Sequence, residues 1–190
     1  MNSTLRPLLV LFFLLSLVTG IAYPLVITGI AKATMPFQAG GSIVQRDGMA
    51  VGSLLIGQSF NDPRHFWSRP SATSPGPNNA VSSGGSNQGP SNPALFDAVK
   101  GRVDALRAAD PDNKEPVPVD LVTASGSGLD PEISVAAARY QAARIARMRA
   151  IPLERVSALI SEHSKGQILG FLGEPRVNVL ELNMALDSAP

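Results

Sequence analysis

The hydrophobic pattern divides the chain into one long apolar stretch near its start and a longer remainder of mixed character. Residues 7–31 carry no charge between Arg6 and Lys32. A helix of these 25 residues would be roughly 37 Å long, enough to cross a hydrocarbon core of about 30 Å. We therefore expect one transmembrane helix over residues 7–31, a short tail over residues 1–6 and a domain over residues 32–190.

A cleaved secretory signal is the alternative interpretation of this stretch. Arg6 would be its positive n-region and residues 8–18 its apolar core. Gly20, Ile21 and Ala22 would then form a small-residue cleavage site, and the mature chain would begin at Tyr23. The apolar run continues well past that point, which favours an uncleaved anchor.

The charges around the span predict its orientation. Only one arginine lies in the short tail before it, an arrangement typical of a helix whose N-terminus stays in the cytoplasm. Lys32 on the other side weakens the bias. We expect Met1 in the cytoplasm and the domain outside it.

Small residues recur every four positions within the span, at Ser16, Gly20, Pro24 and Thr28. Residues at this spacing form one stripe on a helix, and small side chains let a second helix approach closely. Pro24 also leaves the carbonyl of Gly20 without its usual donor, which a neighbouring chain could supply. The stripe therefore predicts a partner-helix contact, although small residues also occur in membrane helices by chance.

Turn residues, caps and apolar periodicity predict the elements of the domain. Asp47 and Gly48 separate two β-rich runs and predict a hairpin over residues 42–60. Residues 119–122 predict a short buried strand. Helices are expected over residues 93–109, 131–149 and 152 to about 166, with a last helix after residue 178. Together they indicate an α+β domain with several helices on a small β-sheet.

Side-chain caps and buried faces follow from the same pattern. Asn92, Asp130 and Asn178 are the expected N-caps, the last with Glu181 in a capping box. The buried faces are expected to hold Leu95, Phe96, Val99, Val103 and Leu106 in the first helix, Ile133, Ala137, Tyr140, Ile145 and Met148 in the second, and Leu153, Val156, Leu159 and Ile160 in the third.

Residues 71–93 are the clearest change of composition, since 18 of these 23 residues are Gly, Ser, Pro or Asn. Such a segment cannot bury enough apolar surface to form a packed element of its own. It is either a surface loop without fixed contacts or an ordered contact surface centred on residues 84–87. Composition slightly favours the first.

Composition excludes several function classes. The net charge of +1 gives no reason to expect a nucleic-acid partner, and the chain has no cysteine for a disulfide or a thiolate metal site. It also lacks the G-x-S-x-G, H-E-x-x-H, phosphate-loop and TVGYG motifs. We expect no catalytic residue, no metal and no cofactor bound by this chain.

Some residue groups keep other interpretations open. A tethered or secreted small hydrolase could use His65 with Ser83 or Ser86, although a lone histidine beside aromatics is more often a packed side chain. A solute-binding accessory domain could use the turn at residues 125–128, where Asp130 would repel a phosphate. The helix over residues 131–149 carries four arginines: Arg139, Arg144, Arg147 and Arg149. They would either form a solvated face or bind anionic lipid headgroups or an acidic partner.

Several long strings, in this order behind one N-terminal membrane helix, resemble the C-subunit family of the bacterial Kdp potassium-transporting ATPase. They are GSLLIGQSF with FWSRPSAT, SGGSN with SNP, PVPVDLVTASGSGLDP and VNVLELNMALD. The resemblance covers essentially the whole chain. It implies a non-enzymatic subunit of an inner-membrane complex, with a periplasmic domain near the potassium entrance of the A subunit, and with partner subunits A, B and F.

The resemblance also implies roles for particular residues. Potassium would be handled by the A subunit and ATP with Mg²⁺ by the B subunit, whose ATP affinity this subunit would raise as a catalytic chaperone. Gln141 matches a glutamine connected with that role. Because a domain outside the membrane cannot touch cytosolic ATP, this effect would have to be transmitted through the transmembrane helices. Contact with the A subunit is expected at Arg69, Gly84, Gly85, Asn87 and Asn92.

Overall fold

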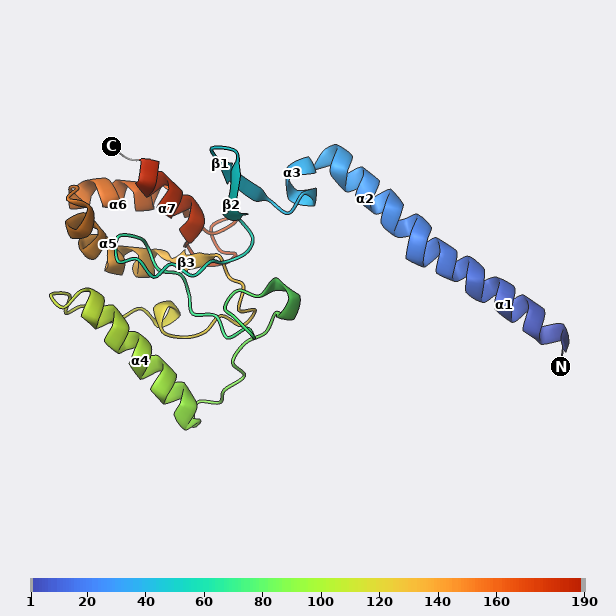
Figure 1. The fold of residues 1–190 in the computed structure, drawn as a ribbon, viewed down its shortest axis with the longest axis horizontal. Helices are drawn as coiled ribbons and strands as arrows, with labels where there is room; N and C mark the ends of the chain where they lie inside the picture. Colours follow the sequence, from blue (N-terminus) through green and yellow to red (C-terminus); the bar gives the residue numbers. More distant parts are fainter. Residues whose placement is uncertain (1, 189–190) are drawn as a thin grey trace. The chain divides into compact units, whose positions relative to one another are not determined.

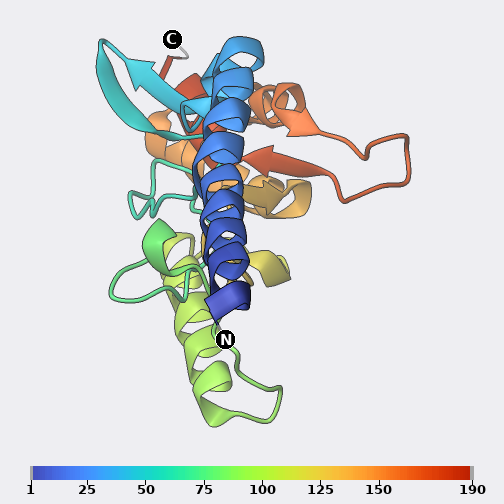
Figure 2. The same cartoon turned by 90° about the vertical axis from the view of Figure 1, so that its right-hand side faces the viewer.

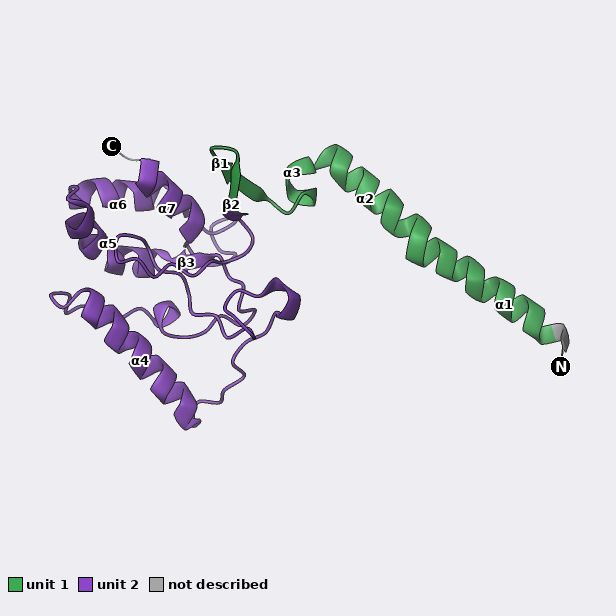
Figure 3. Ribbon diagram, viewed as in Figure 1, with its two compact units in different colours: residues 1–51 green, residues 52–190 purple. Residues whose placement is uncertain are grey.

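A computed structural model describes residues 2–188. The chain divides into two compact units, residues 1–51 and residues 52–190 (Figure 3). The first unit holds the apolar span, a short helix (Pro36–Ala39) and most of a hairpin.

A continuous helical rod forms most of the first unit (Figure 1). Helix α1 (Asn2–Leu17), a π-helical segment (Val18–Ala22) and helix α2 (Tyr23–Thr34) follow one another without a break. The 31 residues Thr4–Thr34 are long and apolar enough to cross a membrane, and none of the span is buried inside the protein. The predicted helix is confirmed and extends beyond residues 7–31 at both ends.

The π-helical segment lies directly before Pro24. Proline has no backbone N–H, and its ring clashes with the carbonyl four residues earlier in a regular α-helix. In the structure the N–H of Tyr23 donates to the carbonyl of Val18, five residues back. The wider turn contains one extra residue, so the small residues on either side of it no longer follow a plain 3.6-residue period.

The predicted hairpin is confirmed in its turn and its first strand. Strands β1 (Ile43–Arg46) and β2 (Met49–Ser53) form a two-stranded sheet. Asp47 and Gly48 have φ angles of 51° and 77°, both in the left-handed region that a tight type I′ turn requires. The second strand ends at Ser53 and does not continue to residue 60, because the following backbone turns away and the N–H of Gly57 donates to the carbonyl of Leu129.

A three-stranded antiparallel sheet of order β3-β5-β4 lies in the second unit. Strand β3 (Glu132–Ser134) pairs with β5 (Arg176–Asn178), which also pairs with β4 (Ser164–Lys165). Helices α5 (Val135–Arg149), α6 (Leu153–Glu162) and α7 (Val179–Ser188) pack around this sheet (Figure 1). Helix α4 (Pro93–Ala109) and short helical turns at Ala80–Ser82 and Val119–Leu121 complete the unit.

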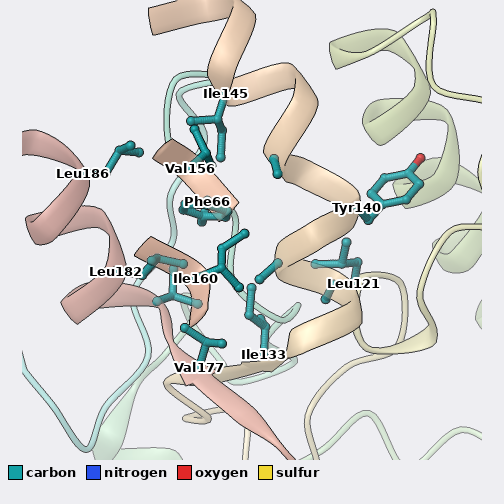
Figure 4. Close-up of a cluster of buried hydrophobic side chains, with 14 of the residues drawn as sticks. Phe66, Leu121, Ile133, Tyr140, Ile145, Val156, Ile160, Val177, Leu182 and Leu186 are labelled. Carbon is teal, nitrogen blue, oxygen red and sulfur yellow. The ribbon is translucent and has the colours of Figure 1, made fainter. Parts of the chain in front are cut away.

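The core of the second unit surrounds Phe66, which comes from an irregular segment and is completely buried. Figure 4 shows side chains from α5, α6, α7 and the sheet converging on this ring. They include Ile133, Ile145, Val156, Ile160, Val177, Leu182 and Leu186. The α+β class expected for this domain is confirmed.

One predicted element is wrong, and one predicted helix begins four residues late. Residues 119–121 form a short 3₁₀ helix and no strand. The helix expected from residue 131 begins at Val135, because Ile133 lies in a strand opposite Val177. The cap is therefore Ser134, whose Oγ accepts from the N–H of Ala137 at 3.0 Å, and Asp130 caps no helix.

The other predicted caps are confirmed. The side chain of Asn92 accepts from the N–H of Ala94 at 3.0 Å, and that of Asn178 accepts from the N–H of Glu181 at 3.1 Å. The buried faces are less accurate, since Phe96 is 64% and Met148 is 51% exposed. Leu153, on α6, is also exposed.

Candidate functional site

The loop over residues 71–93 is held by hydrogen bonds to a second glycine-rich segment, residues 125–130. The Oγ of Ser71 donates to the carbonyl of Gly128 at 2.7 Å, and the N–H of Gly84 donates to the carbonyl of Ser127 at 2.9 Å. Within the loop, Thr73 Oγ1 donates to the carbonyl of Gly76 at 2.7 Å. The structure thus favours the ordered alternative for this loop.

Glycines allow these two segments to approach closely. A Cβ at Gly85 would lie 3.0 Å from the carbonyl oxygen of Gly126. A Cβ at Gly128 would lie 2.5 Å from a methyl carbon of Thr73 and 2.7 Å from the carbonyl oxygen of Gly84, and Gly128 has a φ of 67°. The distances at Gly128 are too short for a side chain and the distance at Gly85 is tight, so the backbones pack directly against each other.

Three of the five residues expected to contact a partner subunit gather around residues 125–130. Gly84 and Gly85 pack on that segment, and Arg69 Nη1 lies 2.9 Å from Asp130 Oδ2. Asn92 instead caps helix α4, and Asn87 is an exposed residue with a φ of 51°. Contact of any of the five with another subunit stays a prediction.

A charged cavity of about 400 Å³ adjoins this cluster. Its carboxylates are largely occupied within the chain: Asp130 by Arg69, Glu132 by Arg176 at 2.7 Å, and Asp120 by the backbone and hydroxyl of Ser134. Among the described residues, no group of three or more His, Cys, Asp or Glu side chains could hold a metal ion. The charged side chains of the cavity are therefore mostly paired with one another or with Ser134.

Gln141, the residue connected by resemblance with nucleotide affinity, is only 1% exposed. Its Oε1 accepts from the N–H of Trp67 at 2.8 Å, and its Nε2 donates to the carbonyl of Trp67 at 3.2 Å and to that of Ala137 at 3.3 Å. Arg144 Nη2 donates to the same Oε1 at 2.8 Å. The hydrogen-bonding capacity of the carboxamide is thus used inside the domain.

Asn183 on α7 repeats this arrangement for the preceding residue. Its Oδ1 accepts from the N–H of Phe66 at 2.8 Å, and its Nδ2 donates to the carbonyl of Phe66 at 3.0 Å. We call the side chains of Gln141 and Asn183 the carboxamide clamp. From two helices the clamp satisfies the backbone of the buried Phe66 and the half-buried Trp67, as neighbouring strands would in a sheet.

Arg144 completes the same network from α5. It is 3% exposed and donates to the carbonyls of Pro63 at 2.6 Å and His65 at 3.1 Å, while its guanidinium lies 4.7 Å from the centre of the Trp67 ring. Burial lowers the pKa of Arg144 to about 10, so it remains charged at neutral pH. The expected solvated or lipid-facing arginine face is wrong for this residue.

Two further arginines of α5 are also engaged. Arg149 donates to the carbonyl of Arg64 at 2.7 Å and pairs with Asp187 at 2.5 Å, and Arg147 pairs with the buried Asp110. Arg139 is exposed. A solvated face therefore remains at Arg139 and at the half-exposed side chain of Arg147.

His65 is a packed side chain, as the commoner interpretation of it expects. Its Nε2 lies 3.0 Å from Asp187 Oδ1 near the end of α7, and its ring lies 6.0 Å from that of Phe60. Ser83 Oγ donates instead to the carbonyl of Ser127. Within the described part of the chain no hydrogen bond joins His65 to Ser83 or Ser86, so the geometry does not support the hydrolase alternative.

Burial of Asp187 raises its pKa, but hydrogen bonds from Arg149 and His65 together outweigh burial. The pKa of Asp187 consequently lies below its usual range. Its carboxylate holds together α5, α7 and the start of the segment that leads into Phe66.

Comparison with known proteins decides the family. The family model described as "K+-transporting ATPase, c chain" (KdpC) matches residues 5–188. The chain belongs to the KdpC family. The resemblance stated from the sequence is thereby confirmed, and with it a place as an accessory subunit of a K+-transporting ATPase.

Relatives match over nearly their full length. A protein of Variovorax paradoxus (strain S110) is 65% identical over 100% of this chain and 98% of its own. Proteins of Polaromonas naphthalenivorans (strain CJ2) and Herminiimonas arsenicoxydans are 65% and 66% identical, over 99% and 98% of this chain and 96% and 98% of theirs. Each is named potassium-transporting ATPase KdpC subunit.

Replacing Gly128 by alanine should destabilise this KdpC-family chain by roughly 1–3 kcal/mol, because the new Cβ meets backbone and the φ is left-handed. Thermal unfolding of the full chain in detergent, followed by circular dichroism, measures the change. Gly126→Ala is the matched control, since a Cβ there meets nothing within 4 Å. Equal melting temperatures of the two variants would contradict the close packing of these segments.

Gln141→Leu should lower the free energy of unfolding by about 2–4 kcal/mol, because it removes the buried carboxamide that pairs with the backbone N–H and carbonyl of the half-buried Trp67. The fluorescence of Trp67, which is the single tryptophan, should shift to longer wavelength as water reaches the ring. Arg139→Leu on the exposed side of the same helix is the control and should change neither quantity. An unchanged Gln141→Leu protein would show that the clamp does not hold this segment.

Asp187→Asn should destabilise the domain at pH 7, and the destabilisation should shrink as the pH falls below about 4. The folded-state pKa of Asp187 is below its unfolded value of about 3.9. Its contribution is therefore fully present above that value and is lost as pH falls through the folded-state pKa. Urea unfolding of the wild type and Asp187→Asn from pH 7 to pH 3 measures the difference, with the exposed Asp112→Asn as control; a difference that does not shrink in acid would contradict this assignment.

Proposed function

We propose that this KdpC-family subunit is a non-catalytic, single-pass component that holds the potassium-translocating A subunit and the ATP-hydrolysing B subunit together, with F as a further partner. The observation that carries the proposal is the Thr4–Thr34 helix, which is long and apolar enough to cross a membrane. A rod of this kind needs lipid and neighbouring helices to cover it. High identity to relatives named KdpC subunits supports the same assembly.

In this proposal the N-terminus is cytoplasmic and the second unit lies in the periplasm of a bacterial inner membrane. The short tail with Arg6 supports that orientation. Potassium and ATP with Mg²⁺ are handled by the A and B subunits, and this chain binds neither. The cluster formed by Arg69, Gly84 and Gly85 faces the A subunit near its potassium entrance, with Asn87 and Asn92 beside it.

The proposal includes an effect on the ATP affinity of the B subunit, exerted as a coupling free energy through the membrane helices. The burial of Gln141 supports an indirect route, because its carboxamide is fully hydrogen-bonded to the domain's own backbone and to Arg144. A change at Gln141 would alter how rigidly α5 is held. It would not remove a nucleotide contact.

Gly20→Leu should release the subunit from the complex purified in mild detergent, because leucine prevents close approach of a partner helix. A Cβ at Gly20 meets nothing within 4 Å in this chain, so the substitution should leave the free subunit intact. Gly29→Leu is the matched control: it lies on the same helix, off the small-residue stripe, and is equally free of neighbours.

Co-purification of the A, B and F subunits with a tagged chain, quantified by mass spectrometry, measures the result. We expect loss of the partners with Gly20→Leu and retention with Gly29→Leu. Retention with both variants would overturn the stripe contact. Absence of all three partners from the wild-type eluate would overturn the proposed function itself.

A further inference from the structure

A small apolar hairpin projects from the sheet between β4 and β5, over residues 166–173 (Figure 2, the orange-red loop). Ile168 and Leu172 exchange two backbone hydrogen bonds, each 2.9 Å long. The side chain of Gln167 donates to the carbonyl of Gly173 at 2.8 Å and closes the base of the loop. These contacts give the hairpin a defined shape before any partner binds.

The tip of this hairpin exposes four large apolar side chains next to one another. Leu169 is 80% and Phe171 70% exposed, with Ile168 at 60% and Leu172 at 49%. Single exposed apolar residues are common on soluble domains, but contiguous ones mark an interaction site. The folding of the domain does not account for them, since none belongs to its buried core.

Leu169 also has an unfavourable backbone conformation. Its φ is 55°, in the left-handed region that asparagine or glycine usually occupies. A leucine there costs conformational energy, and at 80% exposure it recovers none of it by packing within the chain. Neither turn chemistry nor core packing therefore explains the side chain at this position.

The charges near the hairpin favour a protein over a lipid surface as its partner. Residues 166–173 carry no charge. The flanking cations are already paired, Lys165 with Glu181 at 3.3 Å and Arg176 with Glu132 at 2.7 Å. Elements that lie on membranes generally combine apolar residues with free lysine and arginine, and the hairpin has no basic residue.

We propose that the hairpin over residues 166–173 inserts into an uncharged apolar pocket on a neighbouring subunit of the ATPase complex. This inference rests on the proposed place of the chain in that complex. Leu169 and Phe171 are the anchors, and the preformed hairpin lowers the entropy lost on docking.

Site-specific photocrosslinking in the intact complex tests which molecule contacts the hairpin. With p-benzoylphenylalanine in place of Leu169, irradiation should join this chain to another ATPase subunit, identified by mass spectrometry of the product. A product with a second copy of this chain, a product with phospholipid alone, or no product would each overturn the inference.

A paired substitution tests whether the contact contributes to assembly. Leu169→Ser with Phe171→Ser should lower the yield of co-purified partners by about tenfold or more after dilution in detergent. Phe96→Ser is the control, because Phe96 is 64% exposed on α4, outside the hairpin, and should leave the yield unchanged.

Circular dichroism of the free subunit should give equal melting temperatures for the wild type and both variants, since the side chains lie outside the core. Full retention of partners by the paired variant would overturn the hairpin contact while the proposed function stands. Failure of the wild-type chain to retain partners would be a failure of the proposed function.

Discussion

The backbone of Phe66 and Trp67 passes through the core of the second unit without belonging to a strand, and its polar groups must still be satisfied. Gln141 from α5 and Asn183 from α7 do this with paired hydrogen bonds. An unpaired buried amide costs about 1–3 kcal/mol, so the carboxamides are what allow the Phe66 ring to occupy the centre of the core. The positions of α5 and α7 are fixed by the same bonds.

The need to satisfy buried backbone groups also explains why Arg144 is buried. The turn that leads into Phe66 leaves the carbonyls of Pro63 and His65 pointing inward, and a guanidinium can satisfy both while it stacks on Trp67. Its burial would be costly if those acceptors were missing. Asp187, Arg149 and the ring of His65 then close the outer side of the segment.

Local patterns predicted the parts of the fold that are decided locally. The apolar span, the Asp47-Gly48 turn and the caps at Asn92 and Asn178 each depend on a few adjacent residues. The start of α5 could not be predicted in this way, because Ile133 is drawn into a strand by Val177, which lies far along the chain. The residue pattern around Ile133 alone fits a helix equally well.

The sequence predicted which residues belong to the candidate site, but hardly any of the contacts that they make. Long strings identified the family and pointed to Gln141, but the partner of Gln141 is a backbone segment 74 residues away. Nothing in the spacing of Arg144 distinguishes it from the exposed Arg139 on the same helix. The hairpin over residues 166–173 was not predicted, because its single bridge between Ile168 and Leu172 is too short to give a strand pattern.

Exposed apolar surface has two different physical origins in this chain. In the span, exposed apolar side chains suit a lipid environment, where acyl chains or other helices cover them. In the hairpin, apolar surface is exposed on a domain whose own core is complete around Phe66. Leu169 at the tip of the hairpin also has an unfavourable φ angle. Both surfaces fit the proposed place of the chain in a larger assembly, since each surface would gain stability when another molecule covers it.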